Sequence, residues 1–258
     1  MDDGLLDRGR RRVLARAAAA MGTLVLAGCE RLSSTTWFPK VLGVAEDLNQ
    51  GAARVIGRRA MAQEFTERDL SPAFRSNGTA EPDNAAYRAL AQAGFAGYRL
   101  VVDGLVESPR ELTLAELRGL PSRTQITRHD CVEGWSAIGK WTGARLSAVL
   151  DLARPKPNAR YVVLHCADPM EAEGSAPYYE SIDLDDAYHE QTILAYALNG
   201  SDLPVANGAP IRLRVERQLG YKHAKYVMRL EVVESFAGIR GGQGGYWEDQ
   251  GYQWYAGI

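Results

Sequence analysis

One cysteine of this 258-residue chain has neighbours that could take part in chemistry. Cys131 is preceded by His129 and Asp130 and followed by Glu133 and Trp135. A cysteine thiolate is a soft ligand for transition metals, and coordination to a metal deprotonates the thiol outright. The segment therefore predicts that Cys131 is a metal ligand.

The cysteine count leaves one alternative open. The chain has three cysteines, at positions 29, 131 and 166. If Cys29 carries lipid, a disulfide between Cys131 and Cys166 is the one pairing left in an oxidising compartment. The four histidines are scattered along the chain and form no zinc-like pattern with the cysteines.

Glu133, two residues after Cys131, could supply a proton. A carboxyl group can act as a general acid when burial raises its pKa. The alternative is a structural ion pair with Arg128 or Lys140. A carboxylate at this position would also repel a small anionic substrate, which favours a neutral or cationic one.

The N-terminal residues have the pattern of an export signal. A cluster of arginines precedes an apolar run at residues 17–27, which is shorter than the roughly 20 residues needed to span a bilayer. Arg10 and Arg11 fit the twin-arginine pattern of proteins exported in the folded state. We therefore expect residues 1–28 to be a lipoprotein signal peptide. Cys29 would then anchor the protein to a membrane through its acyl chains. A basic amphipathic helix is the alternative.

The rest of the chain has the composition of an ordinary globular protein. Hydrophobic residues make up 46% and charged residues 24%, and the net charge of −2 gives no reason to expect a nucleic-acid partner. Residues 29–64 are irregular in pattern and predict a tether. We expect one domain over residues 65–258.

Local patterns within that domain predict a strand-rich α+β fold. Thr113 and Glu116 form the capping box of a short helix, and Asn199-Gly200 predicts a turn. Residues 211–217 alternate with a period of two, so Arg212 and Arg214 share one face. We expect strands at 98–106 (a hairpin with Asp103-Gly104 at its turn), 125–127, 161–166, 211–217 and 226–233, and helices at 146–152 and 183–187.

Three separated segments carry a resemblance to a known family. They are residues 131–136 (CVEGWS), 207–212 (NGAPIR) and 220–225 (GYKHAK). Together and in this order they resemble the sulfite-oxidase-fold molybdopterin oxidoreductases. The likeness is nearest to the catalytic subunits of periplasmic methionine sulfoxide reductases. It covers roughly residues 65–258 and implies a barrel-like mixed sheet that binds Mo-molybdopterin.

The resemblance implies roles for individual residues. Cys131 matches the sole protein ligand of molybdenum, and Glu133 matches a glutamate near the metal. Arg212 and Lys225 are chemically suited to the cofactor's phosphate. Taken singly, each could instead be a charge on a solvated surface. The positions matched to cofactor contacts are Arg75, Ser76, Asn77, Cys166, Asn207, Arg212, His223, Ala224 and Lys225.

Two of those matches depart from the family pattern. The segment around Asn77 lacks the paired asparagines and the following tyrosine and glutamate of the reductases, and Asn77-Gly78 could be a plain turn. Cys166 stands where the reductases have a threonine, so a small buried residue is an equal alternative there.

The implied activity is reduction of an S-oxide, which consumes two protons and two electrons. Oxidation of sulfite or another small anion and a non-catalytic lipoprotein are the alternatives. The sequence has no Cys-x-x-Cys-His haem motif, so we expect electrons from another chain, a haem membrane protein or a cytochrome. The twin-arginine signal suits an enzyme whose cofactor is inserted before export. The aromatic segment at residues 244–255 predicts docking over the domain at the mouth of the site, or else a surface for the electron carrier.

Overall fold

The computed structural model describes residues 60–170 and 177–258, with a few isolated positions between residues 35 and 51. The chain divides into two compact units, Met1–Arg58 and Arg59–Ile258, and the second carries the sheets described below. The predicted signal peptide, Cys29 and most of the predicted tether lie outside the described residues. Within the described part of the chain, none of the helices has the length and apolar character needed to cross a membrane.

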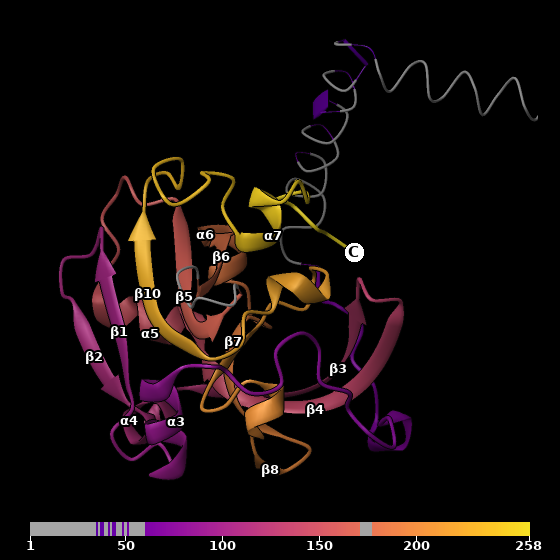
Figure 1. The fold of residues 1–258 in the computed structure, drawn as a ribbon, viewed down its shortest axis with the longest axis vertical. Helices are drawn as coiled ribbons and strands as arrows, with labels where there is room; N and C mark the ends of the chain where they lie inside the picture. Colours follow the sequence, from indigo (N-terminus) through magenta and orange to yellow (C-terminus); the bar gives the residue numbers. More distant parts are fainter. Residues whose placement is uncertain are drawn as a thin grey trace, which may run out of the picture. The chain divides into compact units, whose positions relative to one another are not determined.

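The first sheet has five strands in the spatial order β2-β1-β10-β5-β6 (Figure 1). β1 and β10 pair in parallel, and the other neighbours are antiparallel. Leu100 and Val102 alternate with more exposed residues along β1, as expected for a strand with one face in the core. The strands are β1 (Arg99–Gly104), β2 (Arg110–Thr113), β5 (Tyr161–Pro169), β6 (Pro177–Asp183) and β10 (Val227–Val233).

The second sheet is antiparallel and carries the predicted metal ligand at one end. Its path is β3-β4-β7-β8, and β9 also pairs with β7. The β3–β4 hairpin runs from the pair Ser122–Ala144 to the pair Cys131–Trp135. The strands are β3 (Ser122–Cys131), β4 (Trp135–Arg145), β7 (Ile193–Leu198), β8 (Ser201–Asp202) and β9 (Arg212–Arg214).

Short helices connect the strands and close the ends of the sheets. Thr113 and Glu116 form the predicted capping box at the start of α4, and Asp183 caps α6. The helices are η1 (Glu67–Asp69), α3 (Ala85–Gln92), α4 (Leu114–Gly119), α5 (Leu146–Ala153), α6 (Leu184–Ala187), η2 (Val205–Asn207), η3 (Gly220–Lys222) and α7 (Tyr246–Asp249).

Both sheets contribute to one large hydrophobic core. Leu100 and Leu230 of the first sheet belong to the same cluster as Leu194 and Leu213 of the second, with Leu150 of α5. Burying an aliphatic side chain of this kind contributes about 1.5–3 kcal/mol. The shared core fixes β5 and β9 relative to each other.

The α+β, strand-rich prediction is confirmed, and two local predictions need correction. β1 and β2 do form a hairpin, but Asp103-Gly104 is not its two-residue turn. Gly104 instead lies against β10, where a Cβ atom would come within 2.3 Å of the Val232 carbonyl oxygen. The predicted strand at 211–217 is shorter, Arg212–Arg214, and both of its faces are buried.

Candidate functional site

Cys131 is the last residue of β3, where a tight three-residue turn leads into β4. The Gly134 N–H donates to the Cys131 carbonyl oxygen at 3.1 Å, and Gly134 has a φ of +84°, which favours glycine. The half-buried thiol therefore points from a rigid strand end. Burial raises its pKa in the absence of a metal. Within the described residues Cys131 and Cys166 are both free, so the disulfide alternative is wrong.

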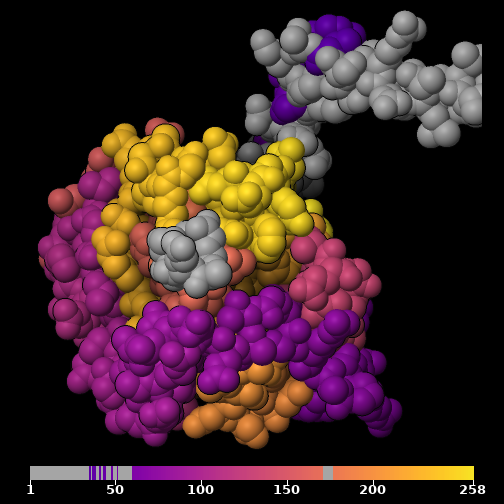
Figure 2. Space-filling model, in the orientation of Figure 1, coloured from indigo at the N-terminus to yellow at the C-terminus, as the bar shows by residue number. Residues whose placement is uncertain are grey.

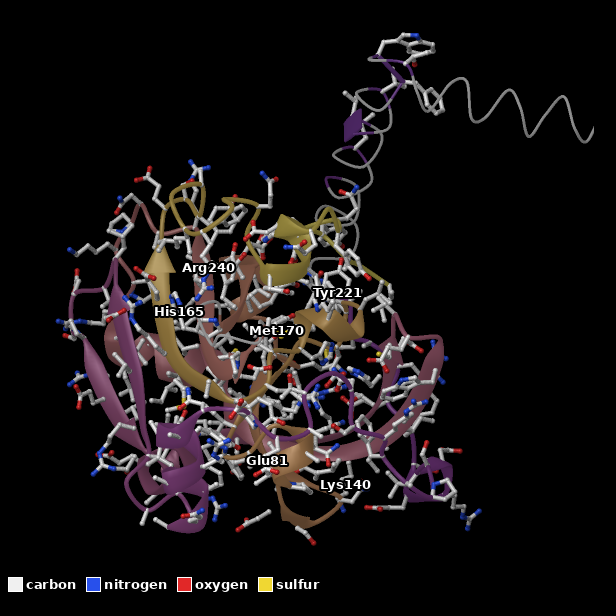
Figure 3. The ribbon with its side chains drawn as sticks, viewed as in Figure 1. Glu81, Lys140, His165, Met170, Tyr221 and Arg240 are labelled. Carbon is white, nitrogen blue, oxygen red and sulfur yellow. The ribbon has the colours of Figure 1, made fainter. Side chains whose placement is uncertain are left out.

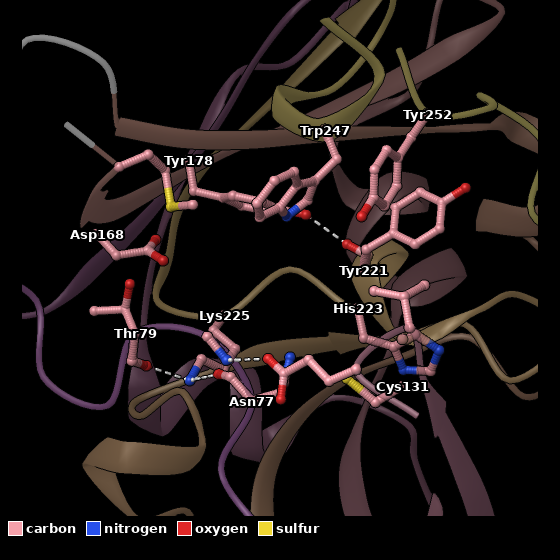
Figure 4. A pocket seen from close by; sticks show the side chains of 15 residues that line it. Asn77, Thr79, Cys131, Asp168, Tyr178, Tyr221, His223, Lys225, Trp247 and Tyr252 are labelled. Carbon is pink, nitrogen blue, oxygen red and sulfur yellow. Dashed lines mark hydrogen bonds between the residues drawn. The ribbon is translucent and has the colours of Figure 1, made fainter. Parts of the chain in front are cut away.

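Cys131 opens into a cavity of about 240 Å³ (Figure 4). Its wall combines the β3–β4 turn, the loop at residues 77–79, the ends of β5 and β6, the η3 loop and the C-terminal segment. Met170 and Tyr221, two of the lining residues, lie near the middle of the view in Figure 3, whereas Lys140 lies near its lower edge. The lining residues are Asn77, Gly78, Thr79, Cys131, Val132, Glu133, Asp168, Met170, Tyr178, Gly220, Tyr221, His223, Lys225, Trp247 and Tyr252.

Lys225 joins two of the segments predicted to bind a cofactor. Its Nζ donates to the carbonyl oxygens of Asn77 at 2.7 Å, Ala206 at 2.9 Å and Thr79, and to Ser76 Oγ at 3.4 Å. The lysine is only 5% exposed, so the solvated-surface alternative for it is wrong. The structure thus brings residues 75–77 beside residues 223–225.

Arg212 is fully buried at the start of β9. Its guanidinium donates to the carbonyl oxygens of Asn207 at 3.0 Å and His223 at 3.3 Å, and it lies over the Trp141 ring, 5.1 Å from the centroid. The solvated strand face considered for Arg212 is therefore wrong. Arg212 holds together the other two predicted cofactor segments.

Several buried polar atoms of these segments have no hydrogen-bond partner among the described residues. Nearly all buried polar groups in proteins form hydrogen bonds, and an unpaired one costs about 1–3 kcal/mol. Among the residues that the structure describes, four predicted cofactor contacts have such an atom: Asn77 Oδ1, Asn207 Nδ2, Arg212 Nε and His223 Nδ1. Asn77 and His223 line the cavity, and Arg212 connects Asn207 to His223, so a polar ligand bound there could satisfy these atoms.

The electrostatics of the cavity favour an anion. Burial and the neighbouring Arg214 lower the pKa of Arg212 to about 9. Burial and Arg212 lower the pKa of Lys225. Arg214 is neutralised by Glu216 at 2.5 Å, whereas in the described part of the chain neither Arg212 nor Lys225 forms an ion pair. A bound phosphate would relieve this repulsion.

Comparisons with known proteins agree with this geometry. Residues 88–237 match the family model described as oxidoreductase molybdopterin binding domain, and that match covers more than half of the chain. The chain belongs to this family.

Several relatives of this molybdopterin-binding oxidoreductase are known. It is 36% identical, over 96% of its length and 87% of the relative's, to a putative protein-methionine-sulfoxide reductase subunit YedZ1 from Azospira oryzae. It is 40% identical over 52% of its length to the protein-methionine-sulfoxide reductase catalytic subunit MsrP of Xanthomonas axonopodis pv. citri, of which it spans 44%. It is 30% identical over 87% of its length to the MsrP of Ralstonia nicotianae, of which it spans 69%.

A solved structure shares the fold. The sulfane dehydrogenase SoxCD of Paracoccus pantotrophus superposes with a TM-score of 0.51 and 21% sequence identity, over 71% of this chain and 47% of the other. This likeness supports the predicted sulfite-oxidase type of fold.

The residues present fit the family's cofactor, Mo-molybdopterin. Cys131 supplies one thiol at a strand end. Within the described residues, no group of three or more His, Cys, Asp and Glu side chains could hold a metal. Arg212 Nε and Asn207 Nδ2 are unpaired donors, and Arg212 brings the positive charge that a phosphate needs. His223 Nε2 donates to the Gln218 carbonyl oxygen, so the unpaired Nδ1 of the neutral ring is an acceptor.

Glu133 lacks the buried environment and raised pKa that we expected of a proton donor. It is exposed, accepts a hydrogen bond from Trp135 Nε1 at 3.0 Å, and lies 3.4 Å from the Gly78 N–H. The bond from Trp135 lowers its pKa instead of raising it. The proposed ion pairs are also absent among the described residues, where Arg128 pairs with Asp130 and Lys140 with Glu67. Its catalytic role stays a prediction.

The other predicted contacts are placed differently. The Arg75 guanidinium lies 5.7 Å from the centroid of the Trp135 ring, beside the Cys131 turn. Ala224 is buried, and its carbonyl oxygen accepts from the Leu213 N–H at 2.8 Å. Cys166 is buried in the core cluster and is not among the described residues that line the cavity.

The C-terminal segment forms part of the cavity wall. This agrees with the prediction that the aromatic residues at 244–255 dock over the domain at the mouth of the site. It covers the upper part of the face shown in Figure 2, in yellow. Trp247 and Tyr252 stack with centroids 5.4 Å apart, and Tyr221 meets Tyr252 edge to face. Glu248 of the same segment accepts a hydrogen bond from the buried Lys222 at 2.6 Å.

Sequence reasoning missed one acidic residue of the site. Asp168 lines the cavity and is 4% exposed. The available signal was an aspartate directly following an apolar strand pattern, at the end of a predicted strand, where binding residues are often found.

Proposed function

We propose that this molybdopterin-binding oxidoreductase reduces S-oxides of thioethers, with methionine sulfoxide as the representative substrate. The observation that carries the proposal is the largely apolar cavity beside Cys131, whose rim carries the ionised carboxylate of Glu133. A fixed carboxylate repels sulfite and other small anions and leaves neutral sulfoxides unaffected. The names of the relatives support the same substrate class.

The cavity wall suits an uncharged sulfur substrate. Val132, Met170, Trp247 and Tyr252 give it a largely apolar surface, against which an alkyl thioether would pack. The sulfur of Met170 and the aromatic rings are polarisable partners for a substrate sulfur. These residues would orient the S–O bond toward Cys131 and exclude water from it.

The reaction balances as one sulfoxide, two electrons and two protons giving one thioether and one water. When bound, the molybdenum centre supplies the oxygen-atom transfer chemistry. Cys131 would hold the metal at the end of the rigid β3–β4 hairpin. Arg212, His223 and Lys225 would fix the cofactor from the side of the η3 loop.

The electrons would come from a separate protein. Several relatives are named as subunits, which supports a partner chain. We expect a haem protein of the membrane or a cytochrome, which would approach the face that carries the cavity mouth. Tyr252, 42% exposed, and Val132, 47% exposed, offer apolar contacts at that mouth.

The proposed location is outside the cytoplasm, after twin-arginine export and lipid attachment at Cys29. The arginine pattern, the short apolar run and the small residues before Cys29 support this location. Replacing Arg10 and Arg11 together with lysine should retain the protein in the cytoplasm. Cys29→Ala should release the exported protein from membranes. Export of both variants to the membrane fraction would contradict the proposal.

Paired assays test the activity. Protein from cells with a complete molybdopterin pathway is given a reduced viologen dye and methionine sulfoxide, and separately sulfite with an oxidised cytochrome. We expect dye oxidation with the sulfoxide and none with Cys131→Ala. Sulfite-driven cytochrome reduction without sulfoxide turnover would establish the anion oxidase instead. If metal-loaded protein were inactive in both assays, the result would favour a non-catalytic lipoprotein that retains the fold.

A further inference from the structure

A stripe of exposed apolar side chains in the first unit has no part in the proposed reaction. Trp37 is 55% exposed, Val41 52%, Val44 58% and Leu48 70%. Single exposed apolar residues are common on proteins, but a contiguous set usually marks a surface that binds something. The stripe is therefore a candidate interaction surface.

The spacing of these residues is that of one face of a helix. They follow one another at intervals of four, three and four positions, which places them within an arc of about 60° at about 100° per residue. Val41, Val44 and Leu48 are helical, and the Val41 N–H donates to the Trp37 carbonyl oxygen at 3.0 Å. The segment predicted as an irregular tether therefore contains helical residues.

A short helix with an uncovered apolar face is weakly stable by itself. Isolated helices shorter than about 12–15 residues are marginal in water, and most helices are stabilised by packing of their apolar face. Within the described part of the chain, none of the hydrophobic core clusters includes a residue of the stripe. Burial of the stripe against a partner would stabilise this helix.

The sequence on both sides of the stripe indicates a lipid surface. Cys29, the proposed site of acylation, precedes Trp37 by eight positions, which an extended chain spans in at most about 29 Å. An acylated Cys29 would therefore keep the stripe close to the headgroup layer. Residues 49–59 contain three arginines and no acidic residue, which suits anionic headgroups. A tryptophan at the end of the stripe is typical of a membrane–water interface.

We propose that the helix carrying Trp37, Val41, Val44 and Leu48 lies in the plane of the membrane surface, with these side chains inserted at the boundary between headgroups and acyl chains. The proposal rests on the lipid-anchored location proposed above. It adds a second membrane contact, which binds lipid whether or not Cys29 is acylated. This contact would keep the enzyme at the surface where a membrane-bound electron donor is available.

The first experiment measures membrane binding without acyl groups. Residues 30–258, the proposed mature chain without its acylated cysteine, are produced in the cytoplasm and mixed with vesicles of phosphatidylglycerol and phosphatidylethanolamine. Flotation then separates bound from free protein. We expect the wild-type sequence to bind, and the partition coefficient of Val41→Asp/Val44→Asp to be at least about tenfold lower, because two charged groups would enter the apolar layer.

The matched control carries the same two changes in the second unit. Leu152→Asp/Ile258→Asp also replaces two exposed apolar residues, and it changes the net charge equally. This control should bind the vesicles as wild type does. Thermal unfolding of the three proteins checks that the second unit is intact in each.

The second experiment locates Trp37 in the full, acylated protein. The protein is reconstituted in vesicles whose lipids carry bromine at defined depths, because bromine quenches tryptophan fluorescence on contact. The difference between wild type and Trp37→Phe isolates the signal of Trp37 from the other tryptophans of the chain. We expect the strongest quenching from bromine near the headgroups and the weakest from bromine at the bilayer centre.

Equal vesicle binding by wild type and Val41→Asp/Val44→Asp, or binding by neither, would overturn the proposal. A wild-type dimer that the double variant converts to a monomer would also overturn it, because the stripe would then bind a second copy of the chain. Binding only to vesicles that contain membrane proteins would assign the stripe to a protein partner instead. If Cys29 carries no lipid, the proposed anchor fails, but flotation of residues 30–258 still decides what the stripe binds.

Discussion

Two buried lysines three residues apart in the η3 loop have opposite surroundings. Lys222 donates to Glu180 at 2.5 Å and to Glu248 at 2.6 Å, and these carboxylates raise its pKa. Lys225 donates to carbonyl oxygens, and its pKa is lowered. The first lysine is neutralised within the protein and holds the fold together. The second has no carboxylate partner among the described residues, so a bound anion would stabilise its charged form.

Removing the ion pairs of Lys222 with Glu180 and Glu248 should have the largest effect on stability. Lys222→Met leaves two buried glutamates without their cation, so the free energy of unfolding should fall by about 3–5 kcal/mol. Chemical denaturation monitored by tryptophan fluorescence measures this loss. In the double variant with Glu248→Gln, part of the stability should return. A Lys222→Met protein as stable as wild type would show that Lys222 does not stabilise the fold.

The corresponding substitution at Lys225 should reduce cofactor binding more than it reduces the stability of the fold. Lys225→Met removes a buried charge that lacks a carboxylate partner, but also several hydrogen bonds to the loop at residues 76–79. The unfolding free energy of the apo-protein should therefore change less than in Lys222→Met. Molybdenum and pterin retention should fall about tenfold or more, because phosphate loses a charged partner. Equal losses of stability in Lys222→Met and Lys225→Met would contradict the distinction between a lysine that stabilises the fold and one that binds the cofactor.

The buried acid near Lys225 should make the apo-protein pH-dependent. The pKa of Asp168 is raised from 3.8 to about 6, so the folded state binds more protons than the unfolded state between these values. Its contribution is fully present below pH 4 and is lost as the pH rises through about 6. Asp168→Asn should stabilise the apo-protein at pH 7 by on the order of 1–3 kcal/mol and have little effect at pH 4. Denaturation curves at the two pH values test this.

The smallest expected effect concerns the exposed carboxylate at the cavity rim. Glu133→Gln removes a charge that is solvated and screened, so any sulfite turnover should rise only about twofold to fivefold. Turnover of methionine sulfoxide should stay within the same factor. Steady-state rates at low and high salt measure the difference, which should shrink as salt increases. A complete loss of sulfoxide turnover would instead make Glu133 essential to the chemistry.

The local sequence predicted those elements whose signals are contiguous. The β3 strand leading to Cys131, the capping box at Thr113 and the turn at Asn199-Gly200 are all confirmed. Their determinants lie within a few residues of one another, so neighbouring side chains are enough to specify them.

Burial of the charged residues could not be predicted from local patterns. The period-two pattern around Arg212 suggested a solvated face, yet Trp141 of another strand covers both arginines. Its ring centroid lies 5.1 Å from the Arg212 guanidinium and 4.5 Å from that of Arg214. Lys222 and Glu180 are 42 positions apart in sequence. The resemblance of three motifs identified Arg212 and Lys225, because a family pattern records long-range contacts that propensities do not.

The order in which the chain is made has a consequence for loading the cofactor. The cavity wall takes residues from position 77 onward, but Trp247 and Tyr252 complete it, and Glu248 secures them through Lys222. During synthesis on a ribosome these residues emerge after every other part of the wall. The cavity is therefore finished only after nearly all of the second unit has been synthesised. The cofactor can therefore be enclosed only once this late-emerging segment has been made and has packed against the rest of the wall.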